Sequence, residues 1–120
     1  MGLLDEWSRR AIERRAGKVE FLGEQTGSVE DTLKRALILE FATRPDIQRA
    51  YLANVAFETP GEHAVALCIV SKRPDDRSLV TRVGEIARRQ SRETDLDVVF
   101  LTSQQESEVA RVCNPFYRGA

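Results

Sequence analysis

Cysteine and histidine are scarce in this sequence, which limits the kinds of reactive site it can form. The 120 residues include two cysteines, Cys68 and Cys113, and one histidine, His63. The cysteines lie far apart and form no CxxC pair, so the sequence indicates neither a disulfide framework nor a zinc site. An odd separation on one strand places Cys68 and His63 on opposite faces, which excludes a Cys–His dyad if that strand is regular. We therefore expect both cysteines to serve in packing and His63 to lie at the edge of a turn, with a general base or a metal ligand as the alternative for His63.

Phosphate-binding glycine motifs are missing, and paired carboxylates have structural explanations. No GxGxxG, P-loop or GxSxG pattern occurs. The acidic pairs are Asp75–Asp76, Asp95 with Asp97, and Glu106 with Glu108. We interpret Asp75 and Asp76 as charge at the start of a helix. We interpret Asp95 and Asp97 as charge at a strand end, with a magnesium-binding pair as the alternative. The sequence thus predicts no enzyme, no metal site and no cofactor.

Long hydrophobic runs and an excess of charge of one sign are absent as well. The longest apolar run, residues 64–70, has seven residues, whereas about 20 are needed to span a bilayer. Acidic residues stand near the N-terminus where a signal peptide has basic ones. Eighteen basic and 19 acidic side chains give a net charge of −1, so no overall charge attracts nucleic acid or an anionic membrane. These absences predict a cytoplasmic protein that binds neither membranes nor nucleic acid.

Arginines are numerous, but their spacing is typical of a solvated helix face. Arg82, Glu85, Arg89 and Arg92 follow one another at three or four residues. This ladder of alternating charge is the pattern of an exposed helix. Proteins that bind single-stranded nucleic acid need aromatic side chains among the basic ones, and this segment has none.

What the sequence does contain is the composition of one globular domain. Hydrophobic residues make up 42% of the chain, and a chain of this length forms a single domain. Residues 1–17 are predicted to form an amphipathic helix whose apolar stripe includes Leu3, Leu4 and Trp7, followed by the domain itself at 18–120. A helix this short is marginal alone, so it should pack on its own domain, on a second copy or on another protein.

Hydrophobic periodicity and turn signals predict the elements of the domain. They are, in chain order, a strand at 19–23, a helix from Ser28 to before Pro45, a short helix at 45–49, hairpin strands at 51–57 and 64–71, a helix at 76–90, a strand at 96–102 and a helix at 103–113. Capping boxes are predicted at Ser28 with Asp31 and at Ser103 with Glu106, and Pro115 is expected to stop the last helix. The order predicts an α/β (α+β) fold: a mixed four-stranded sheet with a β-hairpin and a parallel βαβ unit, and helices packed on it.

Four fragments in a particular order carry a resemblance to a known family. They are EFLGEQ (20–25), PDIQRAYLA (45–53), DLDVVFLT (95–102) and RVCNPFYR (111–118). Together they resemble the C-terminal domain of the bacterial enhanced serine sensitivity (SseB) family, over nearly all of the domain. The resemblance implies no catalytic residues. It also implies that typical members carry a further domain before this one, where this chain has its N-terminal helix.

These observations predict a non-catalytic domain that acts through protein contact, as a regulatory or interaction module. The candidate contact residues are Leu3, Leu4 and Trp7 on the N-terminal helix, and self-association as a homodimer is the simplest arrangement. Phe116 and Tyr117 are expected to stabilise the fold by burial, with an exposed anchor for a partner as the alternative. The alternative function is binding of a small ligand or anion, or an enzyme, with a pocket at the strand ends near Ser71 and Ser103.

Overall fold

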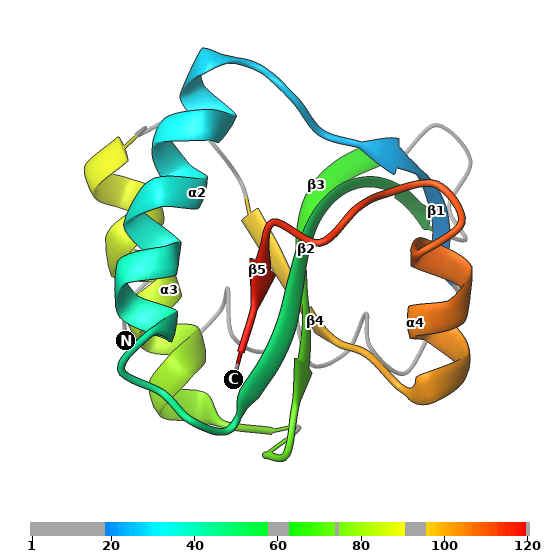
Figure 1. Cartoon of the computed structure of the whole chain (residues 1–120). Coiled ribbons are helices and arrows are strands. Elements are labelled where there is room, and N and C mark those ends of the chain that lie inside the picture. The colour runs from blue at the N-terminus through cyan, green and yellow to red at the C-terminus, as the bar shows by residue number, and fades with distance from the viewer. Residues whose placement is uncertain (1–18, 58–62, 74, 91–95, 120) are drawn as a thin grey trace.

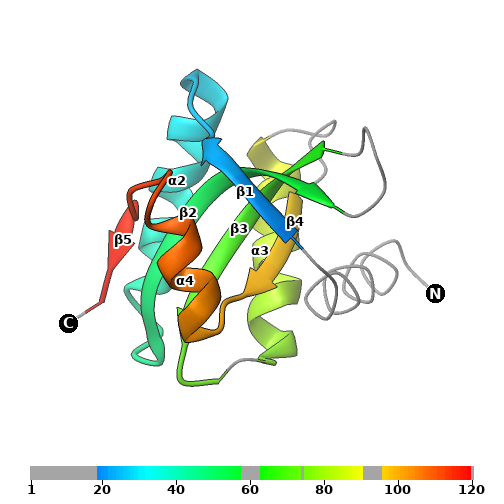
Figure 2. The same cartoon turned by 90° about the vertical axis from the view of Figure 1, so that its right-hand side faces the viewer.

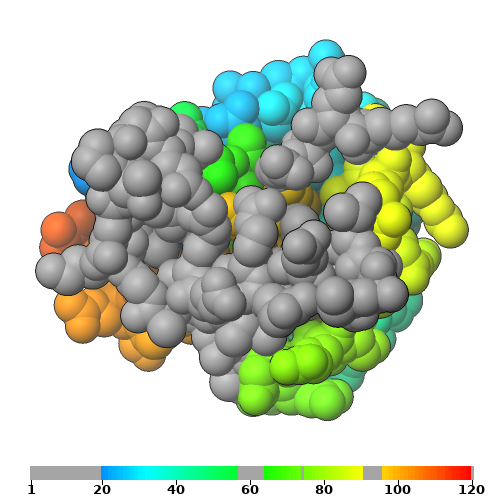
Figure 3. All heavy atoms as spheres, turned by 180° about the vertical axis from the view of Figure 1, so that it is seen from behind, coloured from blue at the N-terminus to red at the C-terminus, as the bar shows by residue number. Residues whose placement is uncertain are grey.

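A mixed β-sheet runs through the middle of the molecule, with helices on both of its faces. The computed structural model describes residues 19–57, 63–73, 75–90 and 96–119, so the predicted helix at 1–17 lies outside the described residues. Two long helices lie side by side on one face of the sheet, and one short helix lies on the other (Figures 1 and 2). Seen from behind, the residues of the second long helix and those of the short helix lie on opposite sides of the molecule (Figure 3).

The described elements follow the predicted order with two differences: the short helix predicted at 45–49 does not form, and one strand is added at the end. They are β1 (Val19–Glu24), α2 (Ser28–Phe41), β2 (Ile47–Phe57), β3 (His63–Ser71), α3 (Arg77–Gln90), β4 (Leu96–Phe100), α4 (Ser103–Val109) and β5 (Tyr117–Arg118). The sheet order is β1-β2-β3-β4, and β5 pairs with β2. Strands β2 and β3 are antiparallel and β3 and β4 are parallel, which confirms both the predicted hairpin and the predicted βαβ unit.

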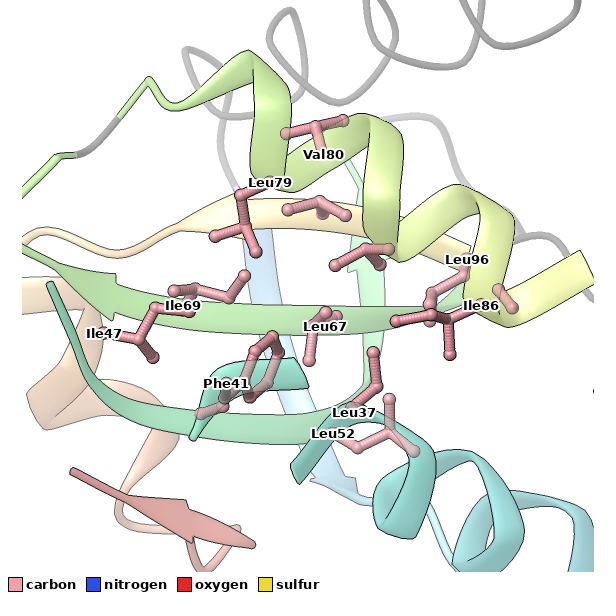
Figure 4. Close-up of a cluster of buried hydrophobic side chains, with 14 of the residues drawn as sticks. Leu37, Phe41, Ile47, Leu52, Leu67, Ile69, Leu79, Val80, Ile86 and Leu96 are labelled. Carbon is pink, nitrogen blue, oxygen red and sulfur yellow. The ribbon is translucent and has the colours of Figure 1, made fainter. Parts of the chain in front are cut away.

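Alternation along the strands divides the core between the two faces of the sheet. Leu67 and Ile69 of β3 point to the face covered by α2 and α3, where they meet Leu37 and Phe41 (Figure 4). Cys68, between them, points to the other face and belongs to the cluster that α4 covers. Residues two apart on a strand share a face, so one nearly apolar strand supplies both layers. The prediction that 64–71 is a central strand covered on both sides is confirmed.

The last residues of the chain are held in the sheet. The backbone N–H of Phe116 donates to the Ala50 carbonyl at 2.9 Å, and that of Gly119 donates to the Gln48 carbonyl at 2.7 Å. Phe116 and Tyr117 lie against Phe41, with ring centroids 6.3 and 5.5 Å from its ring. The Tyr117 hydroxyl also donates to the Phe41 carbonyl at 3.2 Å. Aromatic packing and strand pairing therefore anchor a segment that would otherwise fray.

The predicted short helix at 45–49 is wrong, and a fifth strand was not predicted. Strand β2 already begins at Ile47, which is 2% exposed and pairs with Ser71. Arg49 and Ala50 pair with β5 on the other edge. Proline at the start of a helix is only a local preference, and here pairing with two strands far away in the sequence overrides it. Strand β5 has two residues, too few to show a period of two.

The predicted capping boxes are displaced or missing. Helix α4 is capped by Thr102, whose hydroxyl accepts from the Gln105 N–H at 3.1 Å while the Gln105 side chain accepts from the Thr102 N–H at 3.0 Å. The Ser103–Glu106 box is thus wrong by one residue, because Glu106 has partners elsewhere. Ser28 is the first residue of α2 rather than its cap. Gly27 precedes it with a φ of 148°, a conformation that glycine adopts without strain.

Proline does not stop the last helix either. Helix α4 ends at Val109, six positions before Pro115. The chain continues in turns, in which the N–H groups of Val112 and Cys113 both donate to the Val109 carbonyl. Cys113 is thereby buried against the sheet. We attribute the early end to this burial, since a continued helix would carry the chain past the sheet instead of back to β2.

Replacing Gly119 by alanine should loosen the C-terminal segment. A β-carbon there would overlap the backbone carbonyl of Ile47, which is held in β2 and cannot move aside freely. We expect Gly119→Ala to lower the free energy of unfolding in urea by about 1–3 kcal/mol, as other overpacking substitutions do. Gly23→Ala in β1 is the matched control, because a β-carbon there has no atom within 4 Å. Equal losses in the two variants would contradict the role given to the Gly119 contact.

Candidate functional site

The predicted contact residues fall into two groups. Leu3, Leu4 and Trp7 lie outside the described residues, so their role stays a prediction. Phe116 and Tyr117 lie half-buried against Phe41 and the edge of β2. These contacts account for their conformation through the fold, and a further role in binding a partner stays a prediction.

Both thiols are committed to packing, as predicted. Cys68 is 0% exposed and Cys113 is 5% exposed, and they belong to the same apolar cluster. Burial raises the pKa of the Cys68 thiol far above its ordinary value and that of Cys113 to about 11. A thiol is nucleophilic only as the thiolate, so at neutral pH these side chains act as small apolar groups. The side chain of His63 lies outside the described residues.

The residues near the predicted ligand pocket have local structural partners. The Ser71 hydroxyl accepts from the Arg73 N–H at 3.0 Å, and the Ser103 carbonyl accepts from the Ser107 hydroxyl at 3.2 Å. Asp76 precedes α3, and its carboxylate accepts from the Leu79 N–H at 3.2 Å, which confirms the predicted helix-start role of this residue. These contacts are those of turns and helix starts.

The described part of the chain has neither a cluster of metal ligands nor a membrane-spanning helix. No group of three or more His, Cys, Asp or Glu side chains there could hold a metal ion. Asp97, from the predicted acidic pair, is 1% exposed on β4, and Asp95 lies outside the described residues. None of the helices in those ranges has the length and hydrophobicity needed to cross a lipid bilayer.

A cluster of polar side chains connects α4 to the start of β2. The guanidinium of Arg49 donates from Nε and from Nη2 to the two carboxylate oxygens of Glu106, the second at 2.8 Å. The Tyr51 hydroxyl donates to the same carboxylate at 2.8 Å. Hydrogen bonds from Arg49 and Tyr51 lower the pKa of Glu106 against the opposing effect of burial. Arg118 lies opposite Arg49 in the β2–β5 ladder, so Glu106 also balances a pair of like charges.

The Arg49–Glu106 contact was missed because its partners lie 57 positions apart. The sequence placed Glu106 in a capping box, and Arg49 in a helix that does not form. Because both residues were assigned to local structures, the ion pair between Arg49 and Glu106 was not predicted. If residues 47–57 are predicted as a strand, Arg49 and Tyr51 share one of its faces. This shared face is the signal in the sequence for the cluster.

A second charged cluster joins α2 to α3. The Glu40 carboxylate accepts from Arg44 at 2.9 Å and from Arg82 at 3.0 Å. Arg82 also donates to Glu85 at 3.0 Å, which confirms that part of the predicted charge ladder. Burial raises the pKa of Glu40, but the hydrogen bonds from Arg82 and Arg44 outweigh it, so this pKa lies below its ordinary value. The cluster fixes how the two helices lie against each other.

An open groove lies beside this second cluster, on the outer side of α2 and α3. It has a volume of about 240 Å³ and is lined by Ala36, Leu39, Glu40, Arg82, Ile86, Arg89 and Gln90. Leu39 is 75% exposed, the largest value among the exposed large apolar side chains described. Leu39 therefore places one exposed apolar side chain at the rim of this hollow. We call this surface the α2/α3 groove.

Removing the charge of Glu106 should destabilise the protein in a pH-dependent way. We expect Glu106→Gln to lower the free energy of unfolding at pH 7 by about 2 kcal/mol, as for other hydrogen bonds to charged groups. The folded-state pKa of Glu106 lies below its ordinary value of 4.5. The ion pair therefore stabilises the wild type above that pH, and the stabilisation disappears as the pH falls through the folded-state pKa. Urea unfolding at pH 7, 5 and 3 should show the two proteins converging.

Glu108→Gln is the matched control for this experiment. Glu108 lies on the same helix and is exposed, with no side-chain partner in the described part of the chain. This variant should unfold like the wild type at every pH. A constant difference between Glu106→Gln and the wild type from pH 7 to pH 3 would show that Glu106 acts by packing rather than by charge.

The thiols should react only when the protein unfolds. We expect an aromatic disulfide reagent to label neither Cys68 nor Cys113 during the first minutes in the folded state, because both are buried. Both should react at once in urea. A Ser107→Cys variant, which adds a thiol on the exposed side of α4, should release one equivalent immediately. Immediate release from the folded wild type would contradict the packing role.

Comparison with known proteins places the chain in a family. A family model described as the SseB protein C-terminal domain matches residues 22–118. No significant match was found among curated proteins or among solved structures. The matched residues run from β1 to β5 and therefore include both charged clusters and the anchored C-terminal segment. The resemblance inferred from the four fragments is confirmed: the chain belongs to the SseB C-terminal domain family.

Proposed function

We propose that this domain acts by binding another protein or a second copy of itself, and catalyses no reaction. The observation that carries the proposal is the α2/α3 groove with the exposed Leu39 beside it. Association that removes a large apolar side chain from water is favourable, because burial of apolar surface lowers the free energy. Grooves between packed helices are also one of the forms in which proteins receive an apolar helix face of a partner.

The placement of the reactive side chains supports the same proposal. Both thiols contribute to the core, and the Arg49–Glu106 and Glu40–Arg82 bridges connect elements of the fold. A group that acts in catalysis must meet a substrate as well as its neighbours. Both cysteines are free. We therefore also propose a cytoplasmic location, because unpaired thiols are typical of a reducing compartment.

Self-association through the N-terminal segment is the form of this proposal that is simplest to measure. Leu3, Leu4 and Trp7 form an apolar stripe in the sequence that one short helix cannot bury by itself. Pairing two such stripes across a twofold axis would bury both. We propose these three residues as the contact within a homodimer.

Light scattering on the purified full chain tests this arrangement. We expect the wild type to have twice the 13.6 kDa mass of one chain, and Trp7→Ala to have the mass of one. Tryptophan is the residue type whose truncation most often costs an interface its affinity. Val112→Ser, which removes an exposed apolar side chain next to α4, is the control and should keep the dimer mass.

A parallel pull-down from cells of the native host covers partners other than a second copy. Proteins recovered with the wild type and lost with Trp7→Ala would place a heterologous contact on the N-terminal stripe. A wild type that has the mass of one chain at every concentration and retains no protein in the pull-down would refute the proposed function.

A further inference from the structure

We infer that the α2/α3 groove binds an acidic amphipathic helix of another protein, with an apolar side chain of that helix seated against Leu39 and Ile86. The inference rests on the proposed function and adds to it a second surface and the chemistry of the partner.

The shape is that of a trough between two antiparallel helices. Arg44, just after α2, reaches Asp76, just before α3, at 3.9 Å, so the end of one helix lies near the start of the other. Ala36 and Leu39 line the trough from α2, and Ile86 lines it from α3. Ile86 is 5% exposed and forms the floor, whereas Leu39 is 75% exposed and stands at the rim. Troughs of this kind accept the apolar face of a third helix.

The charge of the groove selects an acidic occupant. Its one carboxylate, Glu40, already accepts hydrogen bonds from Arg44 and Arg82. Arg89 lines the groove and Arg35 lies one turn before Leu39 on α2, and both are exposed. In the described ranges neither arginine has an acidic partner within ion-pair distance. Among the described residues around the groove, the charge without a partner is therefore positive, and an acidic helix would balance it.

The length of the trough suits a helix of about three turns. A second, smaller hollow of about 30 Å³ is lined by Val29, Glu30, Leu33, Leu52, Val65, Ala87 and Gln90, and shares Gln90 with the groove. Val29 at its rim is 49% exposed. Val29 and Leu39 are ten positions apart on one helix, or about 15 Å at the rise of an α-helix. An occupant of about three turns would therefore be long enough to reach from Leu39 to Val29, with its acidic residues beside Leu39 and Arg89 rather than beside Glu30.

The N-terminal segment of the chain itself is a poorer occupant. Its residues 1–18 hold five basic and three acidic side chains, and Arg9, Arg10, Arg14 and Arg15 follow its apolar stripe. Seating it in the groove would bring these arginines near Arg35 and Arg89. The same repulsion disfavours a second copy inserting that segment, and both arrangements are outcomes of the test below.

Photo-crosslinking in the native host tests the inference on the full chain. The probe is benzoylphenylalanine in place of Gln90, which is exposed and lines both hollows. After irradiation, the crosslinked peptides are sequenced by mass spectrometry. We expect peptides of another protein that hold more acidic than basic residues and have apolar residues at helical spacing. Crosslinks to residues 1–18 of this chain, crosslinks to a basic segment, or no crosslink at all would overturn the inference.

The partner peptide identified by crosslinking is then synthesised, and its affinity for purified variants measures the apolar and the electrostatic contributions to binding. Leu39→Ser and Arg89→Glu should each weaken binding at least tenfold, and the effect of Arg89→Glu should shrink at high salt. Arg111→Glu is the control. It reverses the charge of an exposed side chain after α4, and this variant should bind the peptide like the wild type. Circular dichroism and urea unfolding confirm that the variants fold.

The inference would be overturned if Arg111→Glu also lost affinity for the peptide, or if Leu39→Ser and Arg89→Glu kept the affinity of the wild type. The two proposals fail separately. If the Gln90 probe captures nothing while Trp7→Ala still abolishes a dimer or a partner, the groove assignment fails and the interaction function stands.

Discussion

The backbone of β2 lies in the middle of the sheet, where an unpaired N–H or C=O group would cost free energy comparable to a lost hydrogen bond. Strand β3 pairs along one edge of β2 over nearly its whole length. The other edge is shared: β1 pairs with residues 53–57, and β5 pairs with Arg49 and Ala50. The C-terminal segment therefore completes the sheet, and its aromatic pair closes the core around Phe41. The position of α2 depends on that closure, since Phe41 is the last residue of this helix.

Charged side chains then hold the helices in place on the two faces. Glu106 ties α4 to β2, and Glu40 ties α2 to α3. A carboxylate between two donors orients the elements that carry them, because the bonds are directional and are strengthened by charge. With Glu40 occupied in this way, the outer side of α2 and α3 keeps Leu39 in water and leaves Arg89 without a counter-ion in the described ranges. The proposed binding surface is thus a consequence of how the helix pair is joined.

Periodic patterns in the sequence were sufficient to predict most of the fold. Leu67, Cys68 and Ile69 predicted a strand buried on both faces, and the structure has one. The helix at 77–90 and the parallel pairing of its flanking strands were also predictable, since a βαβ unit has one common geometry. What failed was decided by long-range pairing. Residues 47–49 join a strand because of partners near residues 70 and 118, and Glu106 leaves its expected box for Arg49.

The same distinction applies to the candidate site. The packing role of Cys68 followed from its apolar neighbours in the sequence, and the structure confirms a packing role for both cysteines. The α2/α3 groove could not be predicted, because it exists only where two helices 36 positions apart at their ends converge. In the sequence, nothing distinguishes Leu39 from the other apolar residues of its helix. Leu39 becomes part of a groove because the fold places Ile86 and Arg89 beside it.

The pairing of β5 with β2 also has a consequence for biosynthesis. Ala50 and its partner Tyr117 are 67 positions apart, so the ribosome must add every intervening residue before that stretch of β2 can be closed. Until then a nascent chain presents an open strand edge, the feature through which unfinished proteins pair with one another. Chaperones that shield such edges during translation would have this stretch of β2 as a natural target.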